Sequence, residues 1–224
     1  MVRTLFFLMA MMLGLAVFFN PNTSYAMSRA PETAPVAATP AAEKTIMAFG
    51  DSLMAGYGLP LEKSFPAQLE AALKKAGHNV KVINAGVSGD TTAGGLARLD
   101  WSLQQNPDYV IVALGANDML RATDPVATRQ NLDEILKKLQ VAKKPVLLAG
   151  MRSLRNMHGF FGDSYSKMYK ELAEEYDAVY YPFFLEGVAM EPKLSLDDGM
   201  HPNEAGIALM VENILPDVEE LLEK

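Results

Sequence analysis

The chain has 224 residues, of which 50% are hydrophobic and 21% are charged, values that suit one ordinary globular domain with a sizeable core. Its formal net charge is -7 and no basic stripe is present, which argues against nucleic acid as a partner and against attraction to an anionic membrane surface. The absence of cysteine excludes a thiol nucleophile, a Cys-ligated metal and a lipid anchor on an N-terminal cysteine.

The first 26 residues have the pattern of a signal peptide. Arg3 supplies the positive start, Leu5 to Phe19 is an uncharged apolar run, and Ser24-Tyr25-Ala26 offers small residues at the spacing that a signal peptidase recognises. The apolar run is shorter than the roughly 20 residues that span a bilayer. We therefore expect cleavage after Ala26 rather than a retained anchor, an exported protein that is periplasmic or secreted, and no stable membrane insertion. Processing would remove one arginine and no acidic residue, so the net charge becomes -8.

Residues 27–43 form the next segment. They are rich in alanine, proline and threonine and show no apolar periodicity. This composition predicts a disordered or extended tether between the signal peptide and a domain over residues 44–224.

The domain alternates short apolar runs with amphipathic stretches. Runs without period-2 alternation are typical of strands buried on both faces. The predicted strands are Thr45–Phe49, Val80–Ile83, Tyr109–Leu114, Val146–Ala149 and, with a weaker pattern, Val179–Tyr181.

Helical spacing of apolar residues predicts the elements between the strands. The first predicted helix begins at Ser64 and ends at Gly77, and the second carries Leu96, Leu99 and Leu103 after a cap at Thr91 or Thr92. The third begins at Asp124-Pro125 and the fourth covers residues 163–176. The last runs from Ile207 to Leu221. Pro216 is expected to bend or split this last helix. Such alternation implies right-handed crossovers, and so a three-layer α/β/α fold with a central parallel sheet of about five strands and no second domain.

Polar clusters follow the first three predicted strands. Ser52 lies in Gly50-Asp51-Ser52-Leu53 after the first, Gly89 in Ser88-Gly89-Asp90 after the second, and Asn117 in Gly115-Ala116-Asn117-Asp118 after the third. The carboxyl ends of parallel strands meet at one edge, where open α/β sheets bind ligands. We expect these residues, far apart in sequence, to converge there.

Ser52 is the candidate nucleophile. A serine hydroxyl needs a base within hydrogen-bond reach, and an isolated serine at this place would equally suit a helix cap. Of the three histidines, His78 follows a predicted helix end and His158 lies in an apolar segment, where it would line a pocket or simply pack. His201, in Asp198-Gly199-Met200-His201-Pro202, is the candidate base.

Asp198 and Asp197 compete for the role of orienting His201. A carboxylate three residues before the histidine reaches the imidazole Nδ1 from a turn and stabilises the imidazolium. We favour Asp198 for this short reach, and Asp197 stays open as the rival or as a helix cap.

Acyl transfer also needs donors for a developing oxyanion. The candidates are the backbone N–H groups of Ser52 and Gly89 and the side-chain amide of Asn117. Gly89 allows a close backbone approach because it has no Cβ. Each cluster alone is ordinary turn chemistry; their order along one sheet edge predicts a hydrolytic site.

These four blocks resemble the SGNH (GDSL-type) hydrolase family. Its catalytic serine, oxyanion glycine, oxyanion asparagine and D-x-x-H pair match Ser52, Gly89, Asn117 and Asp198/His201 over nearly the whole domain. The stretches 83–91, 96–99 and 197–203 are most similar to the bacterial exported thioesterase/lysophospholipase/arylesterase subgroup. The resemblance implies a flavodoxin-like sheet, an open active site, and esterase or thioesterase action without cofactor or metal.

Ala116 departs from this pattern, because the subgroup usually has a second glycine there. Its extra methyl is expected to affect specificity more than activity, since Asn117 remains in place.

The segments after the third and fourth strands are rich in methionine and phenylalanine, which suit a groove for alkyl chains but equally a core. Met119, Leu120, Met157 and Phe160 are the candidate substrate-binding residues, with Met151, Leu154 and Phe161 near them in sequence. Arg152 and Arg155 would meet a phosphate or carboxylate, or simply be solvated. The expected partner is a small acyl ester or thioester, with lysophospholipid as one possibility; the oligomeric state is not predicted.

Three other functions stay open. The first is an acetylesterase on an envelope polysaccharide, which export favours and the apolar loops disfavour. A metal-dependent phosphoesterase would use Asp51, Asp90, Asp118, Asp198 and His201, although these carboxylates are scattered singly. A non-catalytic binding module on the same fold is disfavoured by the presence of both Ser52 and His201.

Overall fold

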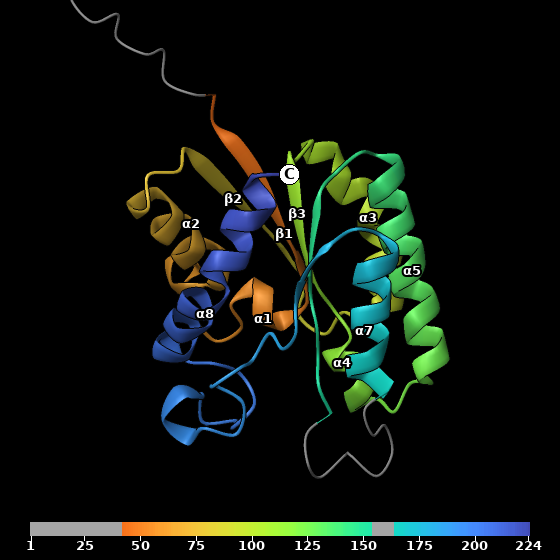
Figure 1. The fold of residues 1–224 in the computed structure, drawn as a ribbon. Coiled ribbons are helices and arrows are strands. Elements are labelled where there is room, and N and C mark those ends of the chain that lie inside the picture. The colour runs from red at the N-terminus through yellow and green to blue at the C-terminus, as the bar shows by residue number, and fades with distance from the viewer. Residues whose placement is uncertain (1–41, 154–163) are drawn as a thin grey trace, which may run out of the picture. The chain divides into compact units, whose positions relative to one another are not determined.

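The computed structural model describes residues 42–153 and 164–224 (Figure 1). The described residues belong to one compact unit. The predicted signal peptide and nearly all of the tether lie outside the described residues, as do Leu154, Arg155, Met157, His158, Phe160 and Phe161. Within the part that the structure describes, no helix has the length and apolar character needed to cross a membrane.

Five parallel strands form one sheet, as the sequence predicts. They are β1 (Lys44–Gly50), β2 (Val80–Gly86), β3 (Tyr109–Ala113), β4 (Val146–Ala149) and β5 (Val179–Tyr181), in the order β2-β1-β3-β4-β5. Gly50 pairs with Gly86 of β2 and with Ala113 of β3, so these three strands end at the same level. All five residues of β3 are buried, because helices cover both faces of the sheet.

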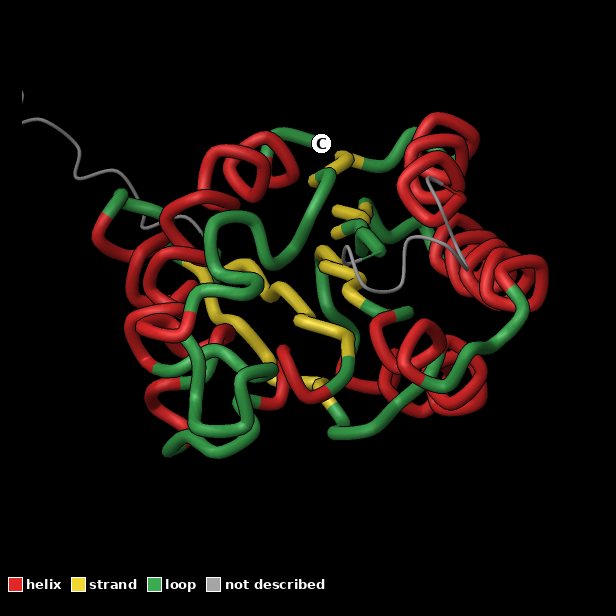
Figure 2. Tube along the Cα trace, turned by 90° about the horizontal axis from the view of Figure 1, so that it is seen from below, coloured by secondary structure: helices red, strands yellow, loops and turns green. Residues whose placement is uncertain are grey.

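The helices form two outer layers around this sheet, which confirms the three-layer α/β/α prediction. Figures 1 and 2 show α2 (Phe65–Lys75) and α8 (Glu204–Leu222) on one face and α3 (Thr92–Ser102), α5 (Pro125–Val141) and α7 (Ser164–Glu175) on the other. The predicted caps at Thr91 and Asp124 are present: their side chains accept N–H groups of Gly94 and Val126 at 3.2 and 2.9 Å.

The last helix is not split at Pro216. Helix α8 continues through this residue as one element, with buried apolar side chains on both sides of it. Proline removes one backbone donor, whereas Ile207, Val211 and Ile214 before it and Val218 and Leu221 after it all pack in the core. Burial of these apolar side chains outweighs the free-energy cost of the backbone hydrogen bond that is lost at Pro216.

The sequence pattern did not predict two short helices at the carboxyl ends of β1 and β3. Helix α1 (Ser52–Ala55) has four residues and α4 (Ala116–Leu120) has five, too few for an apolar period to show. Helix α1 lies directly against the end of β2, because a Cβ at Gly86 would stand 2.2 Å from the backbone nitrogen of Ala55. Glycine at position 86 therefore lets the two backbones meet.

We expect Gly86→Ala to lower the free energy of unfolding by about 3 kcal/mol, because the new methyl collides with backbone that has no room to move. Gly77→Ala is the control: its methyl meets open space, and only the φ of +99° is strained, so a loss of about 1 kcal/mol is expected. Urea-induced unfolding measures both. Equal losses in the two variants would contradict the close approach of α1 to β2.

Candidate active site

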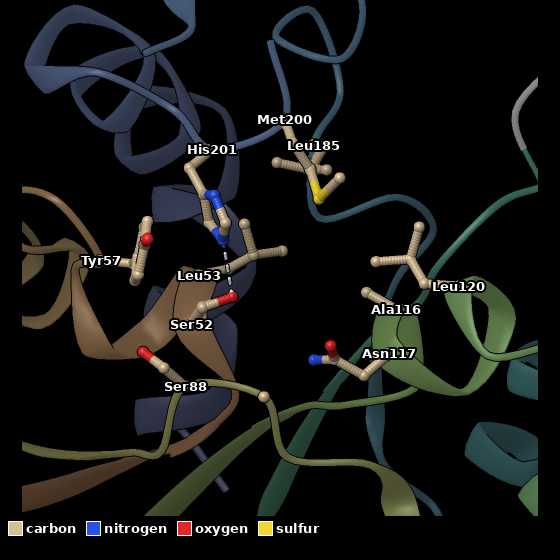
Figure 3. A pocket seen from close by; sticks show the side chains of 11 residues that line it. Ser52, Leu53, Tyr57, Ser88, Ala116, Asn117, Leu120, Leu185, Met200 and His201 are labelled. Carbon is tan, nitrogen blue, oxygen red and sulfur yellow. Dashed lines mark hydrogen bonds between the residues drawn. The ribbon is translucent and has the colours of Figure 1, made fainter. Parts of the chain in front are cut away.

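A cavity of about 280 Å³ opens at the carboxyl ends of β1, β2 and β3 (Figure 3). Ser52 at the start of α1, Gly89 after β2 and Asn117 in α4 all line it, together with His201 from the loop before α8. In this strand order the β1/β3 position is the switch point at which flavodoxin-like sheets bind ligands. The structure thus brings together the four predicted blocks.

Ser52, His201 and Asp198 form a continuous chain of hydrogen bonds. The Ser52 Oγ lies 3.0 Å from His201 Nε2, and His201 Nδ1 lies 2.6 Å from Asp198 Oδ2. The other oxygen of Asp198 accepts the backbone N–H groups of Met200 and His201, both at 2.9 Å. The rival Asp197 is exposed, and the carboxylate on the imidazole belongs to Asp198.

The hydrogen bonds that Asp198 accepts determine its charge state. The backbone N–H of His201, its imidazole and the N–H of Met200 lower the pKa of Asp198 to about 2. Asp198 is consequently a carboxylate at neutral pH. A carboxylate on Nδ1 favours the tautomer with a proton there, which leaves Nε2 free to accept the Ser52 hydroxyl.

The loop that carries His201 is braced from several sides. Ser195 and Pro202 form an antiparallel bridge, and the N–H of Leu196 donates to the His201 carbonyl at 2.7 Å. The Tyr57 ring packs against the imidazole with centroids 4.3 Å apart. Sequence reasoning missed Tyr57, because nothing along the chain connects the α1 segment with a loop more than a hundred residues later.

Gly89 occupies a turn that is closed by a local hydrogen bond and braced by tertiary contacts. Its φ is +85°, a conformation that favours glycine, and the N–H of Asp90 closes the turn on the Val87 carbonyl at 3.1 Å. The Asp90 carboxylate pairs with Arg98 at 2.5 Å, and Arg98 also donates to the Gly50 carbonyl at 2.8 Å. Arg98 thereby ties the turn to the end of β1.

Helix α4 presents Asn117 to the cavity because its flanks are anchored. Gly115 has a φ of +112°, and a Cβ there would stand 2.1 Å from the Tyr169 hydroxyl. The fully buried Asp118 accepts the backbone N–H and the hydroxyl of Thr92 at 2.8 and 2.6 Å. In Figure 3 the Asn117 amide lies across the cavity from Ser52.

A second cavity of about 230 Å³ adjoins the first. The two share Ala116, Leu120, Leu185 and Met200, and the second continues along apolar side chains that include Met119, Met151, Phe183, Ala189 and Met190. The predicted residues Met119 and Leu120 are thus at the cavities, whereas Met157 and Phe160 lie outside the described residues. Arg152 lines the second cavity and pairs with Glu186 at 3.2 Å.

Comparisons with known proteins agree with this geometry. The GDSL-like Lipase/Acylhydrolase family model matches residues 48–209. The chain belongs to this family. An arylesterase of Vibrio mimicus is 42% identical over 74% of this chain and 83% of its own, and thioesterase 1/protease 1/lysophospholipase L1 of Escherichia coli K12 is 40% identical over 73% and 77%. A crystal structure of TesA superimposes with a TM-score of 0.76 at 35% identity, covering 80% of this chain and 99% of that one.

This member of the GDSL-like family is accordingly a carboxylic ester or thioester hydrolase. The carboxylates that a phosphoesterase would need for a metal are committed to other partners: Asp90 to Arg98, and Asp118 to Thr92. Across residues 42–153 and 164–224, His, Asp and Glu side chains do not gather in groups of three that suit a metal ion. His78 is 3.1 Å from Glu219 and does not line the cavity at Ser52.

Asp198→Asn is expected to lower kcat by about 10²–10⁴-fold on p-nitrophenyl acetate. The asparagine oxygen keeps the two backbone bonds, but its amide group then faces Nδ1 and favours the wrong imidazole tautomer. Asp197→Asn, with the same change of charge on an exposed neighbour, should stay within about twofold of the unmodified enzyme. The opposite ranking would give the orienting role to Asp197.

Proposed function

We propose that the protein is a serine acyl hydrolase in which Ser52 attacks the acyl carbon, His201 transfers the proton and Asp198 orients the imidazole. The observation that carries this proposal is the unbroken Ser52–His201–Asp198 hydrogen-bond chain at a cavity that Gly89 and Asn117 also line. Geometry of this kind recurs on unrelated folds wherever a serine must be activated at neutral pH.

The reaction proceeds in two halves. Ser52 Oγ forms a bond to the carbonyl carbon of an ester or thioester while its proton passes to His201 Nε2. The N–H groups of Ser52 and Gly89 and the Asn117 amide hold the resulting oxyanion. The intermediate expels the alcohol or thiol, which takes the proton from His201. Water then attacks the acyl-Ser52 ester with His201 as base, releasing the acid and restoring the serine.

The substrate we propose carries an apolar acyl chain. The reacting carbonyl would sit in the cavity beside Ser52, and the chain would continue past Ala116 and Leu120 into the second cavity. The methionines 119, 151 and 190 of its lining are flexible and suit alkyl chains of varying shape. Lysophospholipid is one substrate of this chemistry, and the name of the Escherichia coli relative includes lysophospholipase L1.

We also propose that the enzyme is exported. The support is the pattern of Arg3, the apolar run over residues 5–19 and the small residues ending at Ala26. Export is the feature that favours the alternative substrate, an acetylated polysaccharide of the envelope. The adjoining apolar cavity favours the longer acyl group, because an acetyl group leaves it unfilled.

Hydrolysis of p-nitrophenyl esters from acetyl to palmitoyl tests the proposal. Ser52→Ala should abolish turnover, EDTA should leave the unmodified enzyme unaffected, and the rate should rise from acetyl toward medium-length chains as apolar contact increases. Activity that survives Ser52→Ala would refute the nucleophile, and loss of activity in EDTA would favour a metal-dependent enzyme. A rate highest for acetyl would favour the polysaccharide acetylesterase.

Ala116→Gly should shift the preferred chain length upward. Ala116 belongs to the lining of both cavities, so removal of its methyl widens their junction. The kcat/KM ratio of decanoyl to butanoyl p-nitrophenyl ester is expected to rise about fourfold, which corresponds to the ~0.8 kcal/mol of burying one CH₂ group. Ala189→Gly, which lines only the second cavity, is the control. An unchanged ratio in Ala116→Gly would show that the junction does not limit the acyl chain.

A further inference from the structure

Asp51 is a fully buried carboxylate to which the mechanism above gives no role. It directly precedes Ser52 and caps α1, where its Oδ1 accepts the N–H of Leu53 at 3.0 Å. Its other oxygen, Oδ2, accepts a hydrogen from Nδ2 of Asn117 at 3.3 Å. The carboxylate therefore bridges the helix that carries the nucleophile and the side chain that faces it across the cavity.

The contact with Asp51 determines which end of the Asn117 amide faces the cavity. A primary amide has a donor nitrogen with two N–H groups and an acceptor oxygen, and both ends occupy similar space. An ionised carboxylate only accepts hydrogen bonds, so it attracts the nitrogen and repels the oxygen. One N–H of Asn117 is thereby used by Asp51, and the second is left for the substrate.

We propose that Asp51 is a positioning residue for the oxyanion hole: its carboxylate holds the Asn117 amide with the nitrogen toward the acyl oxygen. The inference rests on the proposed function, because Asn117 must act as an oxyanion donor for its orientation to matter. In an oxyanion hole, an amide turned the other way would place oxygen against oxygen and remove one of the donors that stabilise the transition state.

The ionisation of Asp51 supports this role. Burial raises its pKa to about 6, opposed by the hydrogen bonds from Leu53 and Asn117 and by the nearby His201, while Asp90 adds to the rise. The negative charge of Asp51 contributes to the raised pKa of the buried Tyr169. Asp51 is thus ionised above about pH 6 and gains a proton as the pH falls below it, after which its demand for an N–H donor is gone.

Asp51→Asn is the first test. The substitution keeps the shape and leaves an oxygen to accept the Leu53 N–H, but it turns an amide nitrogen toward Asn117. We expect kcat on p-nitrophenyl butanoate to fall about 10²-fold, the loss of one oxyanion donor, with KM changed by less than about threefold. The control is Asp124→Asn. Like Asp51, Asp124 caps a helix and accepts the N–H of the residue two positions later, here Val126 at 2.9 Å, but Asp124 does not line the cavity at Ser52. An unchanged kcat in Asp51→Asn overturns the proposal.

A double-mutant cycle separates positioning from a structural role. If Asp51 acts through Asn117, then Asn117→Ala removes the benefit, and adding Asp51→Asn costs less than about threefold more in kcat. Losses that multiply would show that Asp51 acts by another route and would overturn the inference. If Asn117→Ala itself has no effect, the proposed oxyanion role of Asn117 fails; if only Asp51→Asn has none, the inference alone fails.

A measurement without substitution at Asp51 covers the case in which that variant does not fold. In the His201→Ala enzyme the neighbouring imidazole is absent, so the Asn117 side-chain amide signals report on Asp51. We expect these NMR signals to shift between pH 4.5 and 8 with an apparent pKa at or somewhat above 6, because His201 lowers the pKa of Asp51 and is absent in this variant. Asn117 signals that do not titrate in this range would overturn the proposal.

Discussion

Parallel pairing of β1 with both β2 and β3 is the constraint on which the site depends. Because Gly50 pairs with Gly86 and with Ala113, the three strands end at one level, and the segments that follow them start side by side. At Gly86 the backbones of β2 and α1 lie so close together that a side chain at this position would collide with α1. Loops separated by tens of residues thereby come within reach of one substrate.

Three carboxylates, of which Asp51 and Asp118 are fully buried and Asp90 is partly buried, then hold these segments in place. Asp118 fixes α4 to the start of α3, Asp90 fixes the Gly89 turn through Arg98, and Asp51 joins α1 to Asn117. A buried carboxylate is costly unless it is hydrogen-bonded, and each of these accepts at least one hydrogen bond of 3.0 Å or shorter. These hydrogen bonds offset the cost of burying the carboxylates and hold the parts of the site in place before substrate binds.

The carboxylate beside the proposed base His201 and the carboxylate beside the proposed oxyanion donor Asn117 lie in different surroundings. The Asp198 side chain is 39% exposed, whereas Asp51 is fully buried, so the same residue type has a lowered pKa in one place and a raised one in the other. Backbone donors dominate at Asp198 and desolvation dominates at Asp51.

Local pattern alone was enough to locate the five strands, the principal helices and the four polar blocks, because apolar period, caps and turn residues are properties of neighbours along the chain. It allowed for a split at Pro216, which does not occur because burial of the α8 stripe outweighs one missing donor. It also overlooked α1 and α4, which have too few residues for an apolar period to show. Spacing already favoured Asp198 over Asp197, and the structure places Asp198 on the imidazole. The ring of Tyr57 on His201 and the bridge from Asp51 to Asn117 came only from the tertiary structure. These contacts depend on how far apart two side chains lie in space and how they are oriented, and the spacing of residues along a sequence determines neither.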